Sequence, residues 1–154
     1  MVDSDEGLKA LSKIYTDFGD FCKKRGQVTE ADTRAKVIDR VLKEALGWPE
    51  DTFNREVPVH EGYLDYLLTY GKRNLVVIEA KREGIPFEVP KTLKTRRKYK
   101  ISGSIKTDPH IKEAIEQTHY YSIEIPVRYA VATNGLCQAL CVKRKEGTSW
   151  PLEL

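Results

Sequence analysis

Several features that define common protein classes are missing from this sequence. No apolar run approaches the eighteen or so residues that a membrane-spanning helix needs, and the acidic residues 1–6 lack the apolar core of a secretory signal. We therefore expect a cytoplasmic protein with no membrane partner. The three cysteines, Cys22, Cys137 and Cys141, have neither zinc-finger nor Cys-x-x-Cys spacing, which favours reduced, structural roles.

The signatures of several enzyme classes are also absent. There is no Gly-x-x-x-x-Gly-Lys-Ser/Thr loop, so this chain carries no P-loop motor. There is no Gly-x-Ser-x-Gly nucleophile elbow, and the three histidines, His60, His110 and His119, lack metal-ligand spacing. The chemistry of this chain must therefore be sought in its carboxylates and amines.

Charge is unevenly distributed along the chain. Its 26 Lys+Arg and 23 Asp+Glu give a net charge of only +3. Residues 91–106 hold seven basic residues and no acid, which leaves 19 basic against 23 acidic residues, a net charge of −4, elsewhere. A basic loop can neutralise phosphates and attract DNA in a salt-sensitive, sequence-independent way, although a merely exposed loop is the alternative. The candidate DNA-binding residues of this basic run are Lys91, Lys94, Arg96, Arg97, Lys98, Lys100 and Lys106.

Hydrophobic periodicity predicts two helices before the first strand. Apolar residues recur at steps of three and four through 7–24, and this helix should end at Gly26. Thr29 and Asp32 resemble an N-cap with an acidic third residue, opening a second helix that should stop at Gly47. At 40% hydrophobic residues, the chain can bury a core.

The period then changes to that of strands. Runs of β-branched and aromatic residues at 53–59, 63–70 and 75–82 predict a three-stranded antiparallel meander. A helix is expected from about 109 to 123, followed by strands at 126–133 and 136–144 joined by Asn134-Gly135 as a two-residue hairpin. The segment between them has no clear period.

Three charged residues interrupt the strand runs and carry the sequence's main chemical signal. Asp65 lies in the second run, and Glu79 and Lys81 lie in the third, where they share a face with Val77. Charges with little access to water are costly unless paired or bound to a metal. If Asp65 lies beside Glu79, the two carboxylates form an oxygen-ligand site suited to Mg²⁺, with Lys81 placed to assist a water nucleophile.

Strand register decides this hypothesis. Asp65 and Glu79 share a sheet face only if the numbers of facing residues sum to an even value, so a plain two-residue turn would separate them. We therefore expect an odd-length loop or a bulge around residues 71–74. The alternative is a structural ion pair of Lys81 with Asp65 or Glu79 near the strand ends.

Taken together, these motifs resemble the PD-(D/E)xK nuclease superfamily, in which an Asp on one strand precedes Glu-x-Lys on the next. More narrowly, residues 29–145 are similar to the N-terminal nuclease domain of type I restriction enzyme R subunits. The matching segments are Ala45-Leu46-Gly47-Trp48, Tyr63-Leu64-Asp65-Tyr66, Val77-Ile78-Glu79-Ala80-Lys81-Arg82, Glu116-Gln117-Thr118-His119-Tyr120-Tyr121 and Ala132-Thr133-Asn134-Gly135.

The resemblance implies an α/β restriction-endonuclease-like core, α-β-β-β-α-β, with a central mixed sheet flanked by helices and an extra N-terminal helix. It implies DNA cleavage with Mg²⁺, or Mn²⁺ in its place, Asp65 and Glu79 as metal ligands and Lys81 as the catalytic lysine. Gln117 and Tyr121 match the family's Gln-x-x-x-Tyr motif, whose implied role is supporting the site and contacting DNA. The family's partners are an ATP-dependent translocase region downstream and other restriction subunits.

Two further residues are candidates for the site, and the sequence differs from the family pattern in two respects. Glu30 either approaches the metal or is an acid favoured at a helix start, and Arg34 either binds a phosphate or pairs with Glu30. Leu64 stands where the fullest family pattern has proline, and the segment between Lys81 and Gln117 is longer than the family usually shows.

We thus expect one domain over 1–154: a helical extension at 1–28, a nuclease core at 29–145 with a basic insertion at 84–107, and a tail at 146–154 that is cut from a larger protein. The expected function is a metal-dependent DNA endonuclease. The alternatives are a non-cleaving nucleic-acid-binding module of the same fold and a nuclease acting on branched DNA or RNA.

Overall fold

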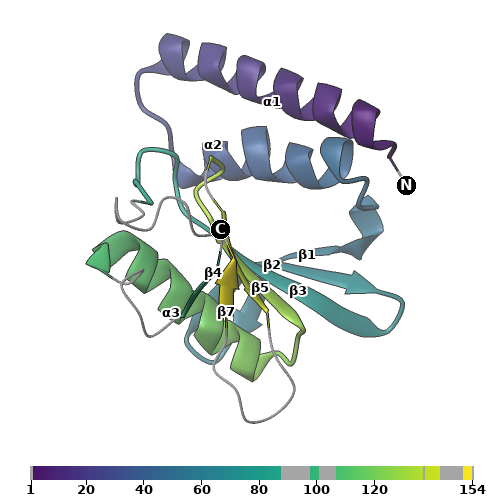
Figure 1. The fold of residues 1–154 in the computed structure, drawn as a ribbon, viewed down its shortest axis with the longest axis vertical. Coiled ribbons are helices and arrows are strands. Elements are labelled where there is room, and N and C mark those ends of the chain that lie inside the picture. Colours follow the sequence, from purple (N-terminus) through teal and green to yellow (C-terminus); the bar gives the residue numbers. More distant parts are fainter. Residues whose placement is uncertain (1, 88–97, 101–106, 137, 143–150, 154) are drawn as a thin grey trace.

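A computed structural model describes residues 2–87, 98–100, 107–136, 138–142 and 151–153 and shows an α/β fold built on a mixed sheet (Figure 1). The predicted α/β class is confirmed. In Figure 1 the long N-terminal helix α1 lies over a second helical segment, the sheet lies beneath that segment, and α3 covers the other sheet face. Within the described residues, no helix is both long and apolar enough to cross a membrane.

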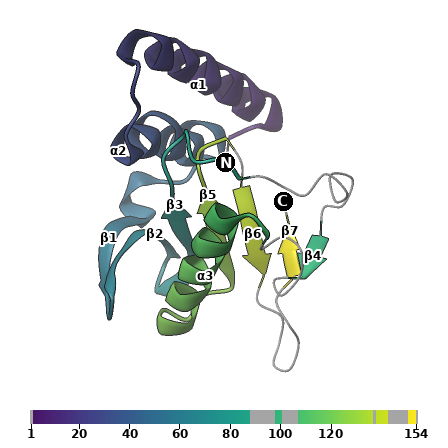
Figure 2. The same ribbon diagram turned by 90° about the vertical axis from the view of Figure 1, so that its left-hand side faces the viewer.

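The strands of the described residues join in the order β1-β2-β3-β5-β6-β7-β4, which Figure 2 shows from one edge to the other. The pair β3 and β5 is parallel, and the other neighbours are antiparallel. The predicted meander and the central place of its third strand are therefore confirmed. The strand bounds are β1 Phe53–Val59, β2 Gly62–Tyr70, β3 Arg73–Ala80, β4 Lys98–Lys100, β5 Tyr129–Thr133, β6 Gln138–Val142 and β7 Pro151–Glu153.

The part of the chain before β1 is helical, as the periodicity predicts. Helix α1, Ser4–Arg25, ends at Gly26, whose φ of +73° favours glycine. Thr29 and Asp32 form the expected capping box. The segment that they open runs as α2 Glu30–Thr33 and two π-helical stretches, η1 Arg34–Ile38 and η2 Val41–Ala45, and a 3₁₀ turn, η3 Glu50–Thr52, precedes β1. The π-helical turns were not predicted.

Three apolar clusters hold these layers together. The cluster between α3 and the sheet contains Leu67, Val77 and Ile115. The cluster on the opposite sheet face joins Leu68 and Ile78 to the second helical segment. A third cluster lies between that segment and α1. Burial of this apolar surface is the main stabilising contribution, and it places the ends of β2 and β3 between two helical layers.

Helix α3, Pro109–Glu124, begins as predicted with Asp108 as its N-cap, which accepts a hydrogen bond from the backbone nitrogen of Ile111. The expected hairpin between β5 and β6 is present, but its connection differs. Thr133 pairs with Gln138, so more than two residues separate the paired positions, and the predicted two-residue turn at Asn134-Gly135 is wrong. One reason is that the side-chain oxygen of Asn134 accepts the backbone N–H of Leu136, closing a local turn.

Two short strands were not predicted. Strand β4 lies inside the basic insertion 84–107, and β7 lies inside the expected tail 146–154; they pair with each other, and β7 also pairs with β6. Three-residue strands give too few positions for a period of two to be recognised.

Candidate active site

The pairing of β2 with β3 ends one residue short of the two candidate metal ligands, Asp65 and Glu79. Tyr66 faces Ile78 and Leu67 faces Val77, so the facing numbers have the even sum that the hypothesis requires. Near the turn the sum is odd, because Tyr70 faces Arg73, and the register shifts by one at an irregularity beside Leu68 and Thr69. The bulge is thus confirmed, slightly farther from the turn than expected, with Leu75 as the extra residue.

The inside-outside alternation of two strands changes at the site. In β2, Leu64 packs with the α3 cluster, whereas Tyr66 and Leu68 pack on the opposite face. Asp65 lies between them, at the change. In β1 the same change occurs at Glu56, the residue between Arg55 and Val57, which face Tyr66 and Leu64. Glu56 has a φ of +52°, and among the described residues no other non-glycine residue has a positive φ.

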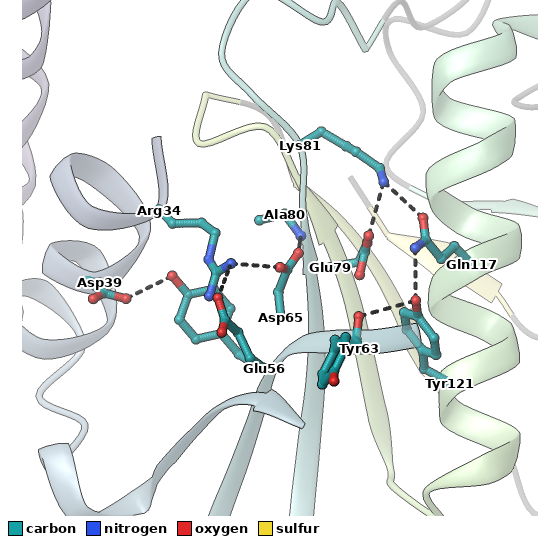
Figure 3. Close-up of polar contacts among 11 residues, drawn as sticks. Arg34, Asp39, Glu56, Tyr63, Asp65, Glu79, Ala80, Lys81, Gln117 and Tyr121 are labelled. Atoms are coloured by element: carbon teal, nitrogen blue, oxygen red, sulfur yellow. Dashed lines mark hydrogen bonds and ion pairs between the residues drawn. The ribbon is translucent and has the colours of Figure 1, made fainter. Parts of the chain in front are cut away.

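A continuous chain of hydrogen bonds runs from β3 to α3 (Figure 3). Lys81 Nζ lies 3.0 Å from Glu79 Oε1 and donates to Gln117 Oε1 at 2.8 Å. Gln117 Nε2 donates to the hydroxyl of Tyr121 at 2.9 Å, and that hydroxyl lies 3.4 Å from the carbonyl oxygen of Tyr63. Four of the predicted site residues therefore form one connected group.

Asp65, the fifth, is held from two sides. Its Oδ2 accepts the backbone N–H of Ala80 at 2.7 Å, and its Oδ1 lies 3.1 Å from Arg34 Nη1. Burial raises the pKa of Asp65, while the Ala80 hydrogen bond and the Arg34 charge act in the opposite direction. The carboxylate is thus oriented by the backbone of β3 rather than by a side chain of that strand.

Glu79 is the most unusual group of the site. Its side chain is 5% exposed, and Oε2 has no hydrogen-bond partner among the described residues. Burial, followed by the nearby charge of Asp65, raises the pKa of Glu79 to about 7. A buried carboxylate oxygen without a partner is costly, so this oxygen is available to a cation or a proton donor that enters the site.

Lys81 remains a cation in this arrangement. Burial lowers its pKa, but the charge and hydrogen bond of Glu79, together with the charges of Glu30 and Glu113, raise the pKa overall. Its backbone is also fixed, because Lys81 N donates to Thr133 O at 2.7 Å. A rigidly held ammonium group is suited to stabilising negative charge rather than to removing a proton.

Glu30 lies close enough to interact electrostatically with the site. Burial raises the pKa of Glu30, and the charge of Asp65 raises it further. Glu30 also raises the pKa of Glu79 and of Lys81. Glu30 is at the same time the first residue of α2, which agrees with the helix-start interpretation; its approach to a metal stays a prediction.

The residues present fit one divalent cation. Within the described part of the chain, no group of three or more His, Cys, Asp or Glu side chains forms a ready-made metal site. Mg²⁺, however, typically takes only one or two carboxylates and completes its shell with water and substrate phosphate. Asp65 and Glu79 supply two carboxylates, and Glu79 supplies an oxygen that has no hydrogen-bond partner in the described part of the chain.

The structure describes three of the candidate DNA-binding residues, Arg34, Lys98 and Lys100. Arg34 pairs with Asp65 and, at 3.5 Å, with Glu56 Oε1. The described ion pairs do not join it to Glu30, so the predicted Glu30 pairing is wrong; Arg34 lies instead over the Tyr66 ring, on the Asp65 side. Most of the basic run, Lys91, Lys94, Arg96, Arg97 and Lys106, lies outside the described residues, and Lys98 and Lys100 lie on β4.

Glu56 is the site residue that the sequence did not reveal. It lies in an apparently regular strand run, and a positive φ at glutamate has no sequence signal of the kind that glycine or asparagine provides. An acid between Arg55 and Val57 of β1 offered only a weak hint.

No family model matches the sequence, and no curated protein or solved structure is detectably similar to the chain. What this group of residues can do must therefore be read from its own geometry and charge.

Proposed function

We propose that the chain is a Mg²⁺-dependent DNA endonuclease domain that hydrolyses phosphodiester bonds. The observation that carries the proposal is the buried Glu79 carboxylate: one of its oxygens has no hydrogen-bond partner among the residues that the structure describes, the other lies 3.0 Å from Lys81, and the charge of Asp65 acts on it. Two carboxylates and a lysine at adjacent strand ends are the groups needed to hold a cation and to stabilise a phosphorane-like transition state.

Each side chain has a role that follows from its contacts. Asp65 and Glu79 would hold Mg²⁺ or Mn²⁺, which when bound supplies Lewis acidity at the scissile phosphate and at the attacking water. Lys81 orients that water and stabilises the negative charge that develops on the phosphate oxygens. Gln117 holds Lys81 in place, and Tyr121 holds Gln117. Glu30 adds negative charge on the helix side of the cation.

The order of elements supports the restriction-endonuclease-like part of the proposal. A helix precedes three antiparallel strands, α3 follows them, and β5 then lies parallel to β3. This is the α-β-β-β-α-β order that the resemblance to the type I restriction R-subunit nuclease domain implies. The corresponding partners, an ATP-dependent translocase region and other restriction subunits, belong to the same proposal.

The test is nicking of supercoiled plasmid DNA, because one cut per molecule is enough to be detected. We expect the wild type to nick in Mg²⁺ and to stop when EDTA is added. Lys81→Ala should reduce the rate at least a hundredfold, a loss of the size seen when one charge-stabilising donor is removed. The exposed Lys72 on the β2–β3 turn offers a matched control, and Lys72→Ala should nick at the wild-type rate.

Two outcomes would contradict the proposal. Equal nicking by wild type and Lys81→Ala would indicate a contaminating nuclease or a different site. DNA binding without nicking by either protein, in Mg²⁺ and in Mn²⁺, would favour the non-cleaving binding module. Cleavage of branched DNA or RNA but not of plasmid would keep the chemistry and change the substrate.

A further inference from the structure

We infer that Arg34 acts as a latch on the site. Its guanidinium neutralises Asp65 before a divalent cation binds. When the cation arrives, the guanidinium must move away from Asp65 and towards Glu56. This inference rests on the proposed function, since it concerns the same cation. It assigns Arg34 and Glu56 a role in setting cation affinity, which neither the strand motif nor the helix motif gives them.

The geometry of the latch is specific. Arg34 Nη1 lies 3.1 Å from Asp65 Oδ1 and 3.5 Å from Glu56 Oε1, so one nitrogen is shared by two carboxylates (Figure 3). The guanidinium carbon lies 5.2 Å from the centre of the Tyr66 ring, a cation–π contact. The hydroxyl of that ring is fixed in turn by Asp39 at 2.8 Å. Arg34 is thus supported on a rigid ring beside the candidate ligand.

Glu56 is suited to be the second carboxylate with which the Arg34 guanidinium pairs. Its side chain is 71% exposed, against 13% for Asp65, so it can follow Arg34 outward at little cost. Its backbone is held at a φ of +52° in the middle of a strand. Such a strained backbone conformation is costly and occurs preferentially at functional sites. Here it occurs where β1 changes faces, directly beside Asp65.

A cation and a guanidinium compete at Asp65 for an electrostatic reason. Oδ2 already accepts the Ala80 N–H and Oδ1 faces Arg34, so a cation that approaches this carboxylate meets the guanidinium charge. Two positive charges on one oxygen repel strongly in a half-buried site, where screening by water is weak. Removal of the Arg34 charge should therefore tighten cation binding, whereas a residue that only orients Asp65 would weaken it when removed.

The test is calorimetric titration of the full chain with Mn²⁺, at pH 8 and without DNA. Arg34→Met keeps an alkyl stem over the Tyr66 ring and removes the charge, and it should bind Mn²⁺ about tenfold more tightly than wild type. Glu56→Gln removes the second position and should bind about threefold more weakly. Arg55→Met is the matched control, because Arg55 also lies over Tyr66 but pairs with Asp39 and Glu50; its affinity should change less than twofold.

The other outcomes overturn the latch in distinguishable ways. If Arg34→Met binds Mn²⁺ as wild type does or more weakly, Arg34 is an orienting residue and the proposed nuclease site is unaffected. If Arg55→Met tightens Mn²⁺ binding as much as Arg34→Met, the loss of any nearby positive charge explains the effect, and the contact with Asp65 does not. If neither wild type nor any variant binds Mn²⁺, the latch and the metal-dependent function fail together. Circular dichroism of each variant confirms that it is folded.

Discussion

The ammonium group of Lys81 donates a 2.8 Å hydrogen bond to the side-chain carbonyl of Gln117. This bond connects the residue directly after β3 to the middle of α3, two elements that are separated by the long basic insertion. It fixes Lys81 beside Glu79 without neutralising it, since an amide carbonyl accepts a hydrogen bond but carries no charge. The position and charge of the lysine are therefore set by different neighbours.

Gln117→Ala should reduce nicking about tenfold to a hundredfold and leave the fold intact, because Lys81 keeps its charge but loses the bond that positions it. Tyr121→Phe should have a smaller effect in the same direction, since it only removes the hydroxyl that accepts from Gln117. Single-turnover nicking rates measure both. The exposed Lys112→Ala on the same helix is the control, and a Gln117→Ala rate equal to its rate would exclude the positioning role.

The pKa of Glu79, raised to about 7 by burial and by Asp65, predicts a pH dependence of stability in EDTA. The folded state binds this proton more tightly than the unfolded state, whose glutamate titrates near 4.5, so the stabilisation is complete below about pH 4.5 and is lost as pH rises through 7. The loss attributable to Glu79 is roughly 3 kcal/mol at most.

Urea unfolding at pH 5 and pH 8 measures this effect. Glu79→Gln keeps an oxygen for Lys81 but cannot ionise, so its stability should fall less than that of wild type between the two pH values. Parallel losses in the two proteins would show that Glu79 is not the responsible group.

Local chemistry was predicted from the sequence far better than tertiary pairing. The Thr29 and Asp32 capping box needs only residues three apart, and it is present as expected. The common face of Glu79 and Lys81 follows from strand alternation, and the Lys81 to Glu79 contact agrees with it. A bulge was required to place Asp65 beside Glu79, and the structure has one.

What could not be predicted depends on contacts between distant segments or on rare backbone geometry. The partners of Arg34 come from β1 and β2, twenty or more residues away, and no pattern within its own helix specifies them. The positive φ of Glu56 occurs where β1 changes faces, and glutamate has no intrinsic preference for it. The prediction of a two-residue turn at Asn134-Gly135 was wrong, and a hydrogen bond from the backbone N–H of Leu136 to the Asn134 side chain accompanies the longer connection.

Two glycines of α1 test how the N-terminal extension packs. A Cβ at Gly7 would lie 2.7 Å from the carbonyl oxygen of Ala45, whereas a Cβ at Gly19 would have nothing within 4 Å. Gly19→Ala should stabilise the protein by about 0.5–1 kcal/mol through helix propensity. Gly7→Ala should destabilise it by about 1–3 kcal/mol, because the backbones must move apart. Denaturant unfolding compares them, and equal stabilisation by both would contradict the close approach of α1.

The basic run predicts salt-dependent DNA binding. Each lysine or arginine that neutralises a phosphate contributes about −0.9 to the slope of log K against log salt. Replacement of Lys94, Arg96 and Arg97 by alanine should therefore reduce the slope by up to about 3 without changing sequence preference. Fluorescence anisotropy in Ca²⁺ measures this slope. Alanine at Lys9, Lys13 and Lys24 of α1 is the matched control, and equal slopes for the two triple variants would exclude the basic run as the contact.

The most direct test of the proposed metal site is anomalous diffraction from a crystal of the protein grown with Mn²⁺. We expect an anomalous peak within coordination distance of one oxygen of Asp65 and of Oε2 of Glu79, with the Lys81 to Gln117 hydrogen bond retained. Well-ordered carboxylates with no peak between them at millimolar Mn²⁺, or Glu79 Oε2 bonded to a protein donor instead, would contradict it.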